Sequence, residues 1–371
     1  VDTTPTLSSQ DAVAAASQAI GKIDLNSAAP TTDLQILPSR GKSMLTWRVQ
    51  FGELPTTPIQ KPVVFVDAHN GRVLLKYDNL KTSKNREVHN MNHLTVLPGP
   101  IARIEGQAAV GEPDVDGNFA RLGSTYDCYK TLFGRDSYDN AGAKLISSVN
   151  YGVDYFNAYW NGTQMVYGDG DNVYAKSFAL PLDVTAHELT HGVTEKSSDL
   201  TYIGESGGLN EAMSDVFAAV CELYRDNGGN LATGPNANTW MMGEEFWLDS
   251  QALRFMNDPA KDGFSLDYYS VDFWHHDVHY TSGIPNLAFY LLSQGGSHPR
   301  GKSTNVVSGI GIADAARIFY RLNTVYLTPS STFGDARVGS VKAADDLFGV
   351  GSAQSLAVKS AWTAVGVEVG D

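Results

Sequence analysis

The sequence predicts an α+β protein with a small N-terminal unit and a larger part that is β-rich first and helical afterwards. Three observations lead to this expectation. An Asn-Gly pair stands between two β-like runs near the N-terminus, two histidines four residues apart occur near the middle, and apolar residues recur at helical spacing in the last third. A chain of 371 residues is too long for one small core. We expect domains at residues 1–83, 84–225 and 226–371.

The composition is that of an ordinary globular protein, with 42% hydrophobic and 18% charged residues. A formal charge of −14 argues against a nucleic-acid partner. No apolar run approaches the roughly 18 residues that span a bilayer, so we expect no membrane association. The first residues, VDTTPTLSS, have neither the basic nor the apolar region of a signal peptide, which we expect to be absent or already removed. We expect a monomer.

Residues 1–83 are predicted to form a small domain without a catalytic role. Residues 10–20 have helix-forming composition, and a Pro/Ser/Thr-rich loop is expected to follow them. Residues 44–51 and 62–66 are β-like, and Asn70-Gly71 predicts a hairpin turn. The domain has no cluster of His, Cys or carboxylates at metal-ligand spacing.

The next hundred residues are predicted to supply a sheet. The polar stretch 78–86 has the composition of a linker. Residues 126–133 predict a helix and residues 145–151 a strand. In residues 157–171, aromatic side chains with Gly and Asp indicate a strand and tight turns at a sheet edge. A peptide can bind to such an edge as an added strand.

Two pairs of possible ligands in this region are not expected to bind metal. His89 and His93 are four apart, but Asn residues around them disfavour a helix, so we assign them to a loop or strand. Asp169 and Asp171 lack the further ligands of a calcium loop and are assigned to a turn.

The two cysteines, Cys128 and Cys221, are too few for a disulfide scaffold. They could pair with each other. Because Cys221 lies in an apolar run, two buried thiols are the slightly favoured interpretation.

The stretch that organises the chain contains His187, Glu188 and His191 in the pattern H-E-x-x-H. On a helix the two histidines lie one turn apart on the same face, so both imidazoles can reach one Zn²⁺. Glu188 lies elsewhere around the helix and is a candidate general base for hydrolysis. The alternative is an amphipathic helix whose histidines pack or face solvent.

A catalytic zinc site needs a third protein ligand, and Glu211 is the candidate. We expect Ser206, Gly207 and Gly208 to form a turn, with Glu211 opening a second helix after it. Asp215 lies one turn beyond Glu211, where its carboxylate could accept the free N–H of a ligating histidine.

HELTH followed by GGLNEAMSD resembles the motifs of the thermolysin-like neutral metalloproteases. The resemblance covers residues 84–371 and implies a secreted zinc endopeptidase that prefers a bulky apolar residue after the cut. The implied fold has a β-rich lobe and a helical lobe with the zinc helix between them. Residues 63–82 resemble the end of the family's propeptides, which implies an intramolecular chaperone and inhibitor. An accessory domain that stays attached is the alternative.

The resemblance also implies roles for residues outside the zinc helices. Tyr202 and His279 match the residues that stabilise the transition state, where a phenol and an imidazolium can donate to the oxyanion. Asp277 matches a residue that orients this histidine in one branch of the family. Arg254 matches an arginine that grips a substrate carbonyl. His275 is assigned to a loop, like its neighbour His276.

Substrate-binding residues follow from the same resemblance. Asn157 and the backbone of Ala158 match the edge-strand positions that hold the peptide; an ordinary hairpin is the alternative. Phe178, Val184 and Leu253 are candidates for the walls of the apolar pocket.

A structural calcium is expected close to the zinc helices. Asp183 and Glu222 lie at helical spacing from the zinc ligands, and with Glu244 they match calcium ligands of the family. Thr239 and Met241 stand where further acidic ligands occur, so one calcium is expected rather than two. Solvated surface carboxylates are the alternative.

The C-terminal part is predicted to be helical. Apolar residues recur at i, i+3, i+4 and i+7 in residues 284–292, 312–320 and 358–365. These stripes need no explanation beyond core packing.

Two rival functions remain open at this point. One is a zinc-dependent binding protein that no longer cleaves peptides, although every expected catalytic position is present. The other is an inhibitory binding module, in which residues 1–83 define the function.

Overall fold

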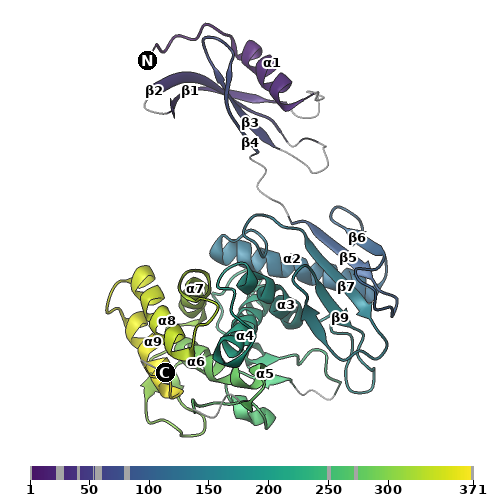
Figure 1. Cartoon of the computed structure of the whole chain (residues 1–371), viewed down its shortest axis with the longest axis vertical. Coiled ribbons are helices and arrows are strands. Elements are labelled where there is room, and N and C mark those ends of the chain that lie inside the picture. The colour runs from purple at the N-terminus through teal and green to yellow at the C-terminus, as the bar shows by residue number, and fades with distance from the viewer. Residues whose placement is uncertain are drawn as a thin grey trace. The chain divides into compact units, whose positions relative to one another are not determined.

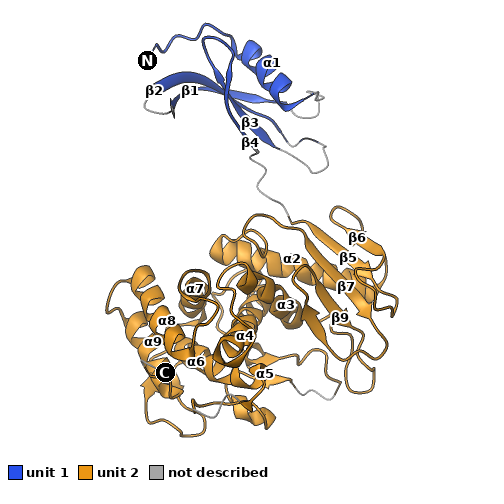
Figure 2. Cartoon of the chain, in the orientation of Figure 1, with its two compact units in different colours: residues 1–83 blue, residues 84–371 orange. Residues whose placement is uncertain are grey.

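The chain divides into two compact units, unit 1 at residues 1–83 and unit 2 at residues 84–371 (Figure 2). Most of the linker expected at 78–86 lies outside the described residues. The computed structural model describes residues 2–21, 29–39, 42–52, 54, 61–78, 84–248, 252–270 and 275–368.

Unit 1 is one helix on one face of a four-stranded antiparallel sheet with the order β1-β2-β3-β4. Ala12 and Ala16 pack on Val49, Val64 and Val66 to form its core. The small alanine side chains bring the helix close to the branched residues of the sheet. The elements are α1 (Ser9–Ile20), β1 (Thr31–Ser39), β2 (Lys42–Gln50), β3 (Pro62–Asp67) and β4 (Val73–Asp78).

The predicted helix, the strands at 44–51 and 62–66 and the hairpin are confirmed in this unit. The predicted loop after the helix is wrong in part, because Thr31–Ser39 is a strand that pairs along its length with β2. It is an edge strand, and Leu34 and Ile36 remain largely exposed on it. Such a strand has a weak apolar pattern, which explains why composition favoured a loop.

Unit 2 begins with a mixed five-stranded sheet of order β6-β5-β7-β9-β8. β8 pairs with β9 in the antiparallel sense and has no strand on its other side, so it is an edge strand. The strands are β5 (Arg86–Asn90), β6 (Ile101–Ile104), β7 (Leu145–Tyr151), β8 (Ala158–Trp160) and β9 (Met165–Gly168).

Two long helices occupy the middle of unit 2, α3 (Leu182–Glu195) and α4 (Gly204–Asp226) (Figure 1). One hydrophobic core lies between the sheet, α2 and α3, and a larger one lies between α4 and the later helices. Residues 84–371 form one compact unit, so the expected lobe boundary at 225/226 stays a prediction. The other elements are α2 (Pro113–Phe133), α5 (Val278–Thr281), α6 (Gly283–Gln294), α7 (Ile312–Arg321), α8 (Phe333–Phe348), α9 (Ala353–Ala364), β10 (Met241–Met242), β11 (Arg254–Phe255), β12 (Gly296–Ser297) and β13 (Val306–Val307).

The cysteines form a disulfide, so the favoured interpretation of two thiols is wrong. Cys128 lies on α2 and Cys221 on α4, and both are fully buried. Their Cα atoms are 5.4 Å apart because the two helices pack against each other. The bond therefore ties the helix that carries Glu211 to the helix beneath the sheet.

The predicted turn at Ser206–Gly208 is also wrong. α4 begins at Gly204, so these residues are helical and Glu211 lies in the second turn. The glycines are explained by packing instead. A Cβ on Gly207 would lie 2.4 Å from Val278 Cγ1, and one on Gly208 would lie 2.6 Å from Thr281 Oγ1. The two glycines thus let α5 approach α4 closely.

Two residues that were not expected to bind metal, His93 and Asp169, contact each other, with His93 Nδ1 2.8 Å from Asp169 Oδ2. His89 is buried in β5 and bonds to Glu87 and to the carbonyl of Gly99. The Asp171 carboxylate accepts three backbone N–H groups of residues 173–175, as in a tight turn. Within the described residues, every helix is too short or too polar to span a bilayer.

Candidate active site

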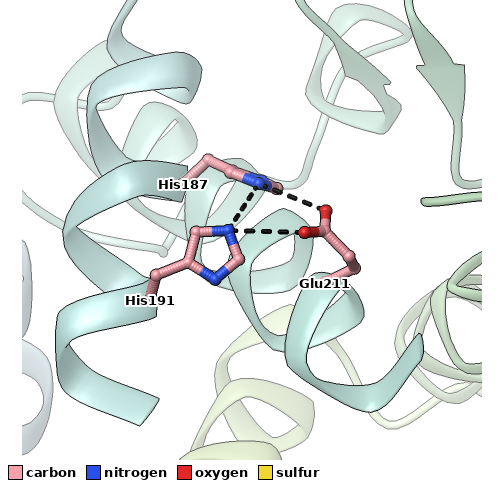
Figure 3. A group of neighbouring side chains, drawn as sticks. All are labelled: His187, His191 and Glu211. Atoms are coloured by element: carbon pink, nitrogen blue, oxygen red, sulfur yellow. Dashed lines mark hydrogen bonds and ion pairs between the residues drawn. The ribbon is translucent and has the colours of Figure 1, made fainter. Parts of the chain in front are cut away.

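Three side chains from α3 and α4 converge on one point (Figure 3). His187 and His191 lie one turn apart on α3, and their Nε2 atoms are 3.1 Å apart. Glu211 on α4 places Oε2 3.4 Å from His187 Nε2 and Oε1 3.5 Å from His191 Nε2. Within the described residues, this trio brings its ligand atoms to within 4.8 Å of one another.

The outer nitrogen of each imidazole is held by an oxygen that can only accept. His187 Nδ1 donates to Asp215 Oδ1 at 2.9 Å. His191 Nδ1 donates to Asn210 Oδ1 at 2.7 Å, and the amide of Asn210 is oriented by its own bond to the carbonyl of Leu200. Both Nε2 atoms therefore face the convergence point, as metal-ligating imidazoles do.

The electrostatics of the trio favour a bound cation. Burial alone would lower the pKa of His187, but Asp215 and Glu211 outweigh it and raise that pKa to about 10. Burial lowers the pKa of His191 to about 4. Glu211 Oε2 is buried and forms no hydrogen bond with the described residues. Two imidazoles and one carboxylate with an unsatisfied oxygen fit Zn²⁺ with an open fourth position.

Asp215 connects His187 to Arg254 and Asn286 through hydrogen bonds. Its Oδ2 accepts from Arg254 Nε and from Asn286 Nδ2, both at 2.8 Å. Its Oδ1 accepts from Arg254 Nη2 at 2.7 Å in addition to His187. Burial would raise the pKa of Asp215, but Arg254 and His187 hold it well below its usual range. The carboxylate therefore stays ionised and fixes the ring of His187.

Glu188 lies in the same cleft and is 5% exposed. Burial raises its pKa to about 7, although the charges of His187 and Arg254 act in the opposite direction. A carboxyl group whose pKa lies near neutrality can accept a proton and release it again at the same pH. The geometry and charge of Glu188 therefore suit a general base.

Tyr202 and His279 face the trio from the other side. The Tyr202 hydroxyl donates to Glu211 Oε1 and lies 3.1 Å from His279 Nε2. Partial burial and the neighbouring Glu211 raise the pKa of Tyr202, so the phenol stays protonated. Asp277 Oδ1 accepts from His279 Nδ1 at 2.5 Å. Partial burial opposes ionisation of Asp277, yet the bonds from His279 hold its pKa below the usual range.

A cavity of about 460 Å³ runs past these groups. A second cavity of about 780 Å³ adjoins the first, and Asn157, Phe178, Leu253, Arg254 and His279 line both. The structure thus places every predicted substrate-binding residue on one cleft. Those that line the first cavity are Asn157, Ala158, Phe178, Val184, Leu253 and Arg254.

The three expected calcium ligands, Asp183, Glu222 and Glu244, are largely buried and close enough for their charges to interact. Burial, followed by the charges of its neighbours, raises the pKa of Glu222 to about 9 and that of Glu244 to about 8. Burial raises the pKa of Asp183 to about 6. Glu222 Oε2 and Glu244 Oε2 form no hydrogen bond with the described residues. This is the environment of a site that takes up either protons or a cation.

Sequence reasoning missed several residues of the site. Asn210 was not singled out, although it directly precedes Glu211 in the quoted motif. Asn286 on α6 carries no local signal, because only the fold brings it to Asp215. Trp160 was not singled out either, although it ends the edge strand and lines the cleft.

Comparisons with known proteins agree with this geometry. A family model described as thermolysin metallopeptidase, catalytic domain, matches residues 76–195, and one described as thermolysin metallopeptidase, alpha-helical domain, matches residues 198–367. A solved structure, the precursor of protealysin, a metalloproteinase from Serratia proteamaculans, has a TM-score of 0.64 and 33% identity. It covers 78% of this chain and 90% of its own.

Three curated relatives illustrate the range of similarity. Bacillolysin of Bacillus cereus is 43% identical over 81% of this chain and 50% of its own length. Bacillolysin of Brevibacillus brevis is 37% identical over 91% of this chain and 68% of its own length. Neutral protease B of Bacillus subtilis is 32% identical over 99% of this chain and 74% of its own length, so that alignment takes in unit 1. The chain thus spans half to three quarters of these relatives.

Proposed function

The chain belongs to the thermolysin family of metallopeptidases, and from that premise we propose that it is a zinc endopeptidase that hydrolyses internal peptide bonds of proteins. The observation that carries the proposal is the convergence of His187, His191 and Glu211 beside the buried Glu188. A peptide-binding protein without activity would have no need for a carboxyl group whose pKa is shifted toward neutrality.

His187, His191 and Glu211 would hold Zn²⁺, which supplies a Lewis acid and lowers the pKa of water toward ~7. Glu188 takes one proton from the attacking water while the oxygen of that water bonds to the scissile carbonyl carbon. The same carboxyl then gives that proton to the leaving amine as the C–N bond breaks. Burial in the cleft raises the pKa of this carboxyl and so favours its taking up the proton.

Two donors stabilise the negative charge that develops on the carbonyl oxygen. Tyr202 offers its hydroxyl, and His279 in its protonated form offers Nε2–H. The Tyr202 hydroxyl and His279 Nε2 lie 3.1 Å apart, so one carbonyl oxygen could be within reach of both. Asp277 accepts from Nδ1 and so fixes the orientation of the His279 ring.

The edge strand β8 and an apolar wall would bind the peptide. Asn157 and the backbone of Ala158 would align the substrate as an added strand, and Arg254 would grip a substrate carbonyl. Phe178, Val184 and Leu253 line the cleft and would accept a bulky apolar side chain after the cut. We therefore propose a preference for such residues at that position.

We also propose one structural Ca²⁺ on Asp183, Glu222 and Glu244. The two orphaned carboxylate oxygens and the raised pKa values support it, since a cation would relieve both. Backbone oxygens or water would complete the ligand set, because Thr239 and Met241 offer no carboxylate.

Unit 1 is proposed to be a propeptide that inhibits unit 2 until it is cut off. The similarity to a protealysin precursor supports this proposal. Intact-mass spectrometry over time, beside an activity assay, tests it. Loss of about 80 residues should accompany a rise in activity. Active protein that always retains residues 1–83 would refute the propeptide.

The protein is further proposed to be secreted and to act as a monomer. The buried disulfide between Cys128 and Cys221 supports secretion, because disulfides persist in oxidising compartments. Fractionation of the producing cells should find the protein in the medium, and light scattering should give the mass of one chain.

Digestion of casein and of a neutral model peptide tests the main proposal. The purified chain should cut both at internal bonds and contain one zinc ion per chain. His187→Ala should lose the zinc and the activity together. A zinc-loaded protein that binds peptides without cutting any of them would favour the binding protein instead.

A further inference from the structure

One end of the cleft carries negative charge that the proposed mechanism does not use. Glu195 and Asp199 line the first cavity together with Trp160. None of these three residues lines the second cavity, which contains Phe156 and Trp247 instead. The cleft therefore has an acidic end at Trp160, Glu195 and Asp199, and an aromatic cavity that also contains Lys261, Asp262 and Asp277.

The direction of the edge strand β8 determines which part of a bound substrate lies at each end of the cleft. A peptide that pairs with β8 in the antiparallel sense runs opposite to the strand, as β9 does on the other side. Its residues after the cut then lie toward Asn157 and the aromatic cavity, and its residues before the cut lie toward Trp160. This direction agrees with the apolar wall at Phe178 and Leu253, which both cavities share.

Glu195 is fixed at the acidic end by two bonds. Its Oε2 accepts from Trp160 Nε1 and its Oε1 from Lys196 Nζ, both at 2.7 Å. Burial opposes its ionisation, but Lys196 and Trp160 hold the pKa of Glu195 below the usual range. Lys196 balances one negative charge at this end and does not line the cavity.

Asp199 supplies a second negative charge. Both Glu195 and Asp199 act on the single positive charge of Lys196, so this end keeps a net negative charge. The Asp199 backbone N–H bonds to the carbonyl of Thr194 at 2.8 Å, and its φ of 53° places the backbone in the left-handed region. The residue is exposed, and its carboxylate forms no hydrogen bond or ion pair with the described residues. Among the described residues that line the first cavity, the one Lys or Arg is Arg254, which is already neutralised by Asp215.

We propose that Asp199, supported by Glu195, gives the enzyme a preference for substrates with lysine or arginine before the cut bond. The inference rests on the proposed peptidase function and adds a specificity to it. A basic side chain that reaches this end meets a net negative charge, whereas an acidic one is repelled. Together with the apolar pocket, this preference defines a substrate with a cation before the cut and a bulky apolar residue after it.

The size of the effect follows from the exposure of Asp199. An exposed ion pair contributes up to about fivefold in an equilibrium constant, and repulsion of a glutamate adds a similar factor. The ratio of kcat/KM for a lysine peptide over its glutamate counterpart should therefore fall by about threefold to tenfold when the Asp199 charge is removed. Raising the salt concentration to ~1 M should shrink the preference of the wild-type enzyme, because the Debye length then falls to about 3 Å.

The experiment starts from the full chain, which is incubated until its peptidase activity no longer rises with time. Three peptides share the same apolar residue after the cut. The residue before the cut is lysine in one, glutamine in the second and glutamate in the third. The variant is Asp199→Asn, and Asp154→Asn is the matched control. Both aspartates are exposed and have a left-handed backbone that asparagine tolerates, and Asp154 lines neither cavity.

The lysine peptide should be cut faster than the glutamate peptide, and Asp199→Asn should reduce that ratio while Asp154→Asn preserves it. If the glutamine peptide is cut but the ratio is unaffected by Asp199→Asn, the preference is refuted and the peptidase function stands. If no peptide is cut by the wild-type chain, the peptidase function fails and the specificity falls with it. An equal effect of both variants would also refute a specific role of Asp199.

Discussion

Substituting Asp215 by asparagine should lower both the stability of the protein and its affinity for zinc, because this one buried carboxylate accepts from four donors. It accepts from His187, twice from Arg254 and once from Asn286, at 2.7 to 2.9 Å. Asparagine keeps the shape but loses the charge and one acceptor oxygen. The NH₂ group of the new amide would then face a donor of Arg254, His187 or Asn286.

The expected loss of stability is large because the partners stay buried. Asp215 is fully buried, and the side chain of Arg254 is 13% exposed. Removing one partner of such a pair leaves an uncompensated charge and costs about 3–5 kcal/mol. For a domain of this size that corresponds to a drop in Tm of about 6–20 °C. Zinc affinity should fall by about 10- to 100-fold, since His187 loses the acceptor that orients it.

The matched control is Asp346→Asn. Asp346 Oδ2 accepts from Arg321 Nε at 2.8 Å, but the two side chains are 40% and 36% exposed. An exposed pair of this kind contributes about 0.2–1 kcal/mol. Thermal unfolding of wild type and both variants, followed by near-UV circular dichroism, is compared at saturating zinc and again with a chelator.

The chelated samples separate the effect of the ion pair from that of zinc binding. Asp215→Asn should remain the less stable variant in both conditions, with the larger difference when zinc is present. If Asp215→Asn lowers Tm no more than Asp346→Asn does, the buried hydrogen bonds of Asp215 do not stabilise the site as proposed.

Three further predictions address the surrounding structure. Replacing Cys128 and Cys221 together by alanine should cost about 2–5 kcal/mol, measured by urea unfolding, because the bond closes a sequence separation of 93 residues in the unfolded chain; an unchanged midpoint would contradict this. With zinc present and calcium omitted, Tm should fall as the pH rises from about 5 to about 9. Burial and neighbouring acids raise the pKa of Glu222 from 4.5 to about 9. Between these pH values the folded state therefore retains a proton that the unfolded state loses. Glu222→Gln should flatten this profile, and calcium should raise Tm in the wild type alone; a flat wild-type profile would refute the acidic site. Gly207→Ala should lower both kcat and Tm, by about 1–3 kcal/mol in stability, because the new Cβ would overlap Val278, the neighbour of His279. Full activity of this variant would show that α5 can move freely.

The arrangement of the zinc ligands was predictable because helix periodicity is local. His187 and His191 lie on one face of any helix that contains them, and Glu211 with Asp215 repeats the same spacing. The structure brings all four together as expected. The glycines beside Glu211 were misread as a turn, because sequence alone does not separate glycine that bends the chain from glycine that allows close packing.

Features that depend on distant contacts were not predictable. The disulfide requires α2 and α4 to lie side by side, and no local pattern indicates that packing. Asn286 reaches Asp215 across 71 positions of sequence. The strand Thr31–Ser39 was missed because it pairs at an edge and has little apolar periodicity. His279 was found through resemblance to a family, since a single histidine in a histidine-rich stretch has no distinguishing spacing.

The most direct test of the proposed chemistry is a comparison of wild type with Glu188→Gln, in which zinc content and kcat are measured on the same samples. Gln keeps the size of the side chain but cannot take a proton from water. Both proteins should contain one zinc ion per chain, and kcat for the neutral peptide should fall by about 10²- to 10⁴-fold in the variant. A Glu188→Gln protein that keeps its zinc and hydrolyses the peptide at the wild-type rate would contradict the assignment of Glu188 as the base.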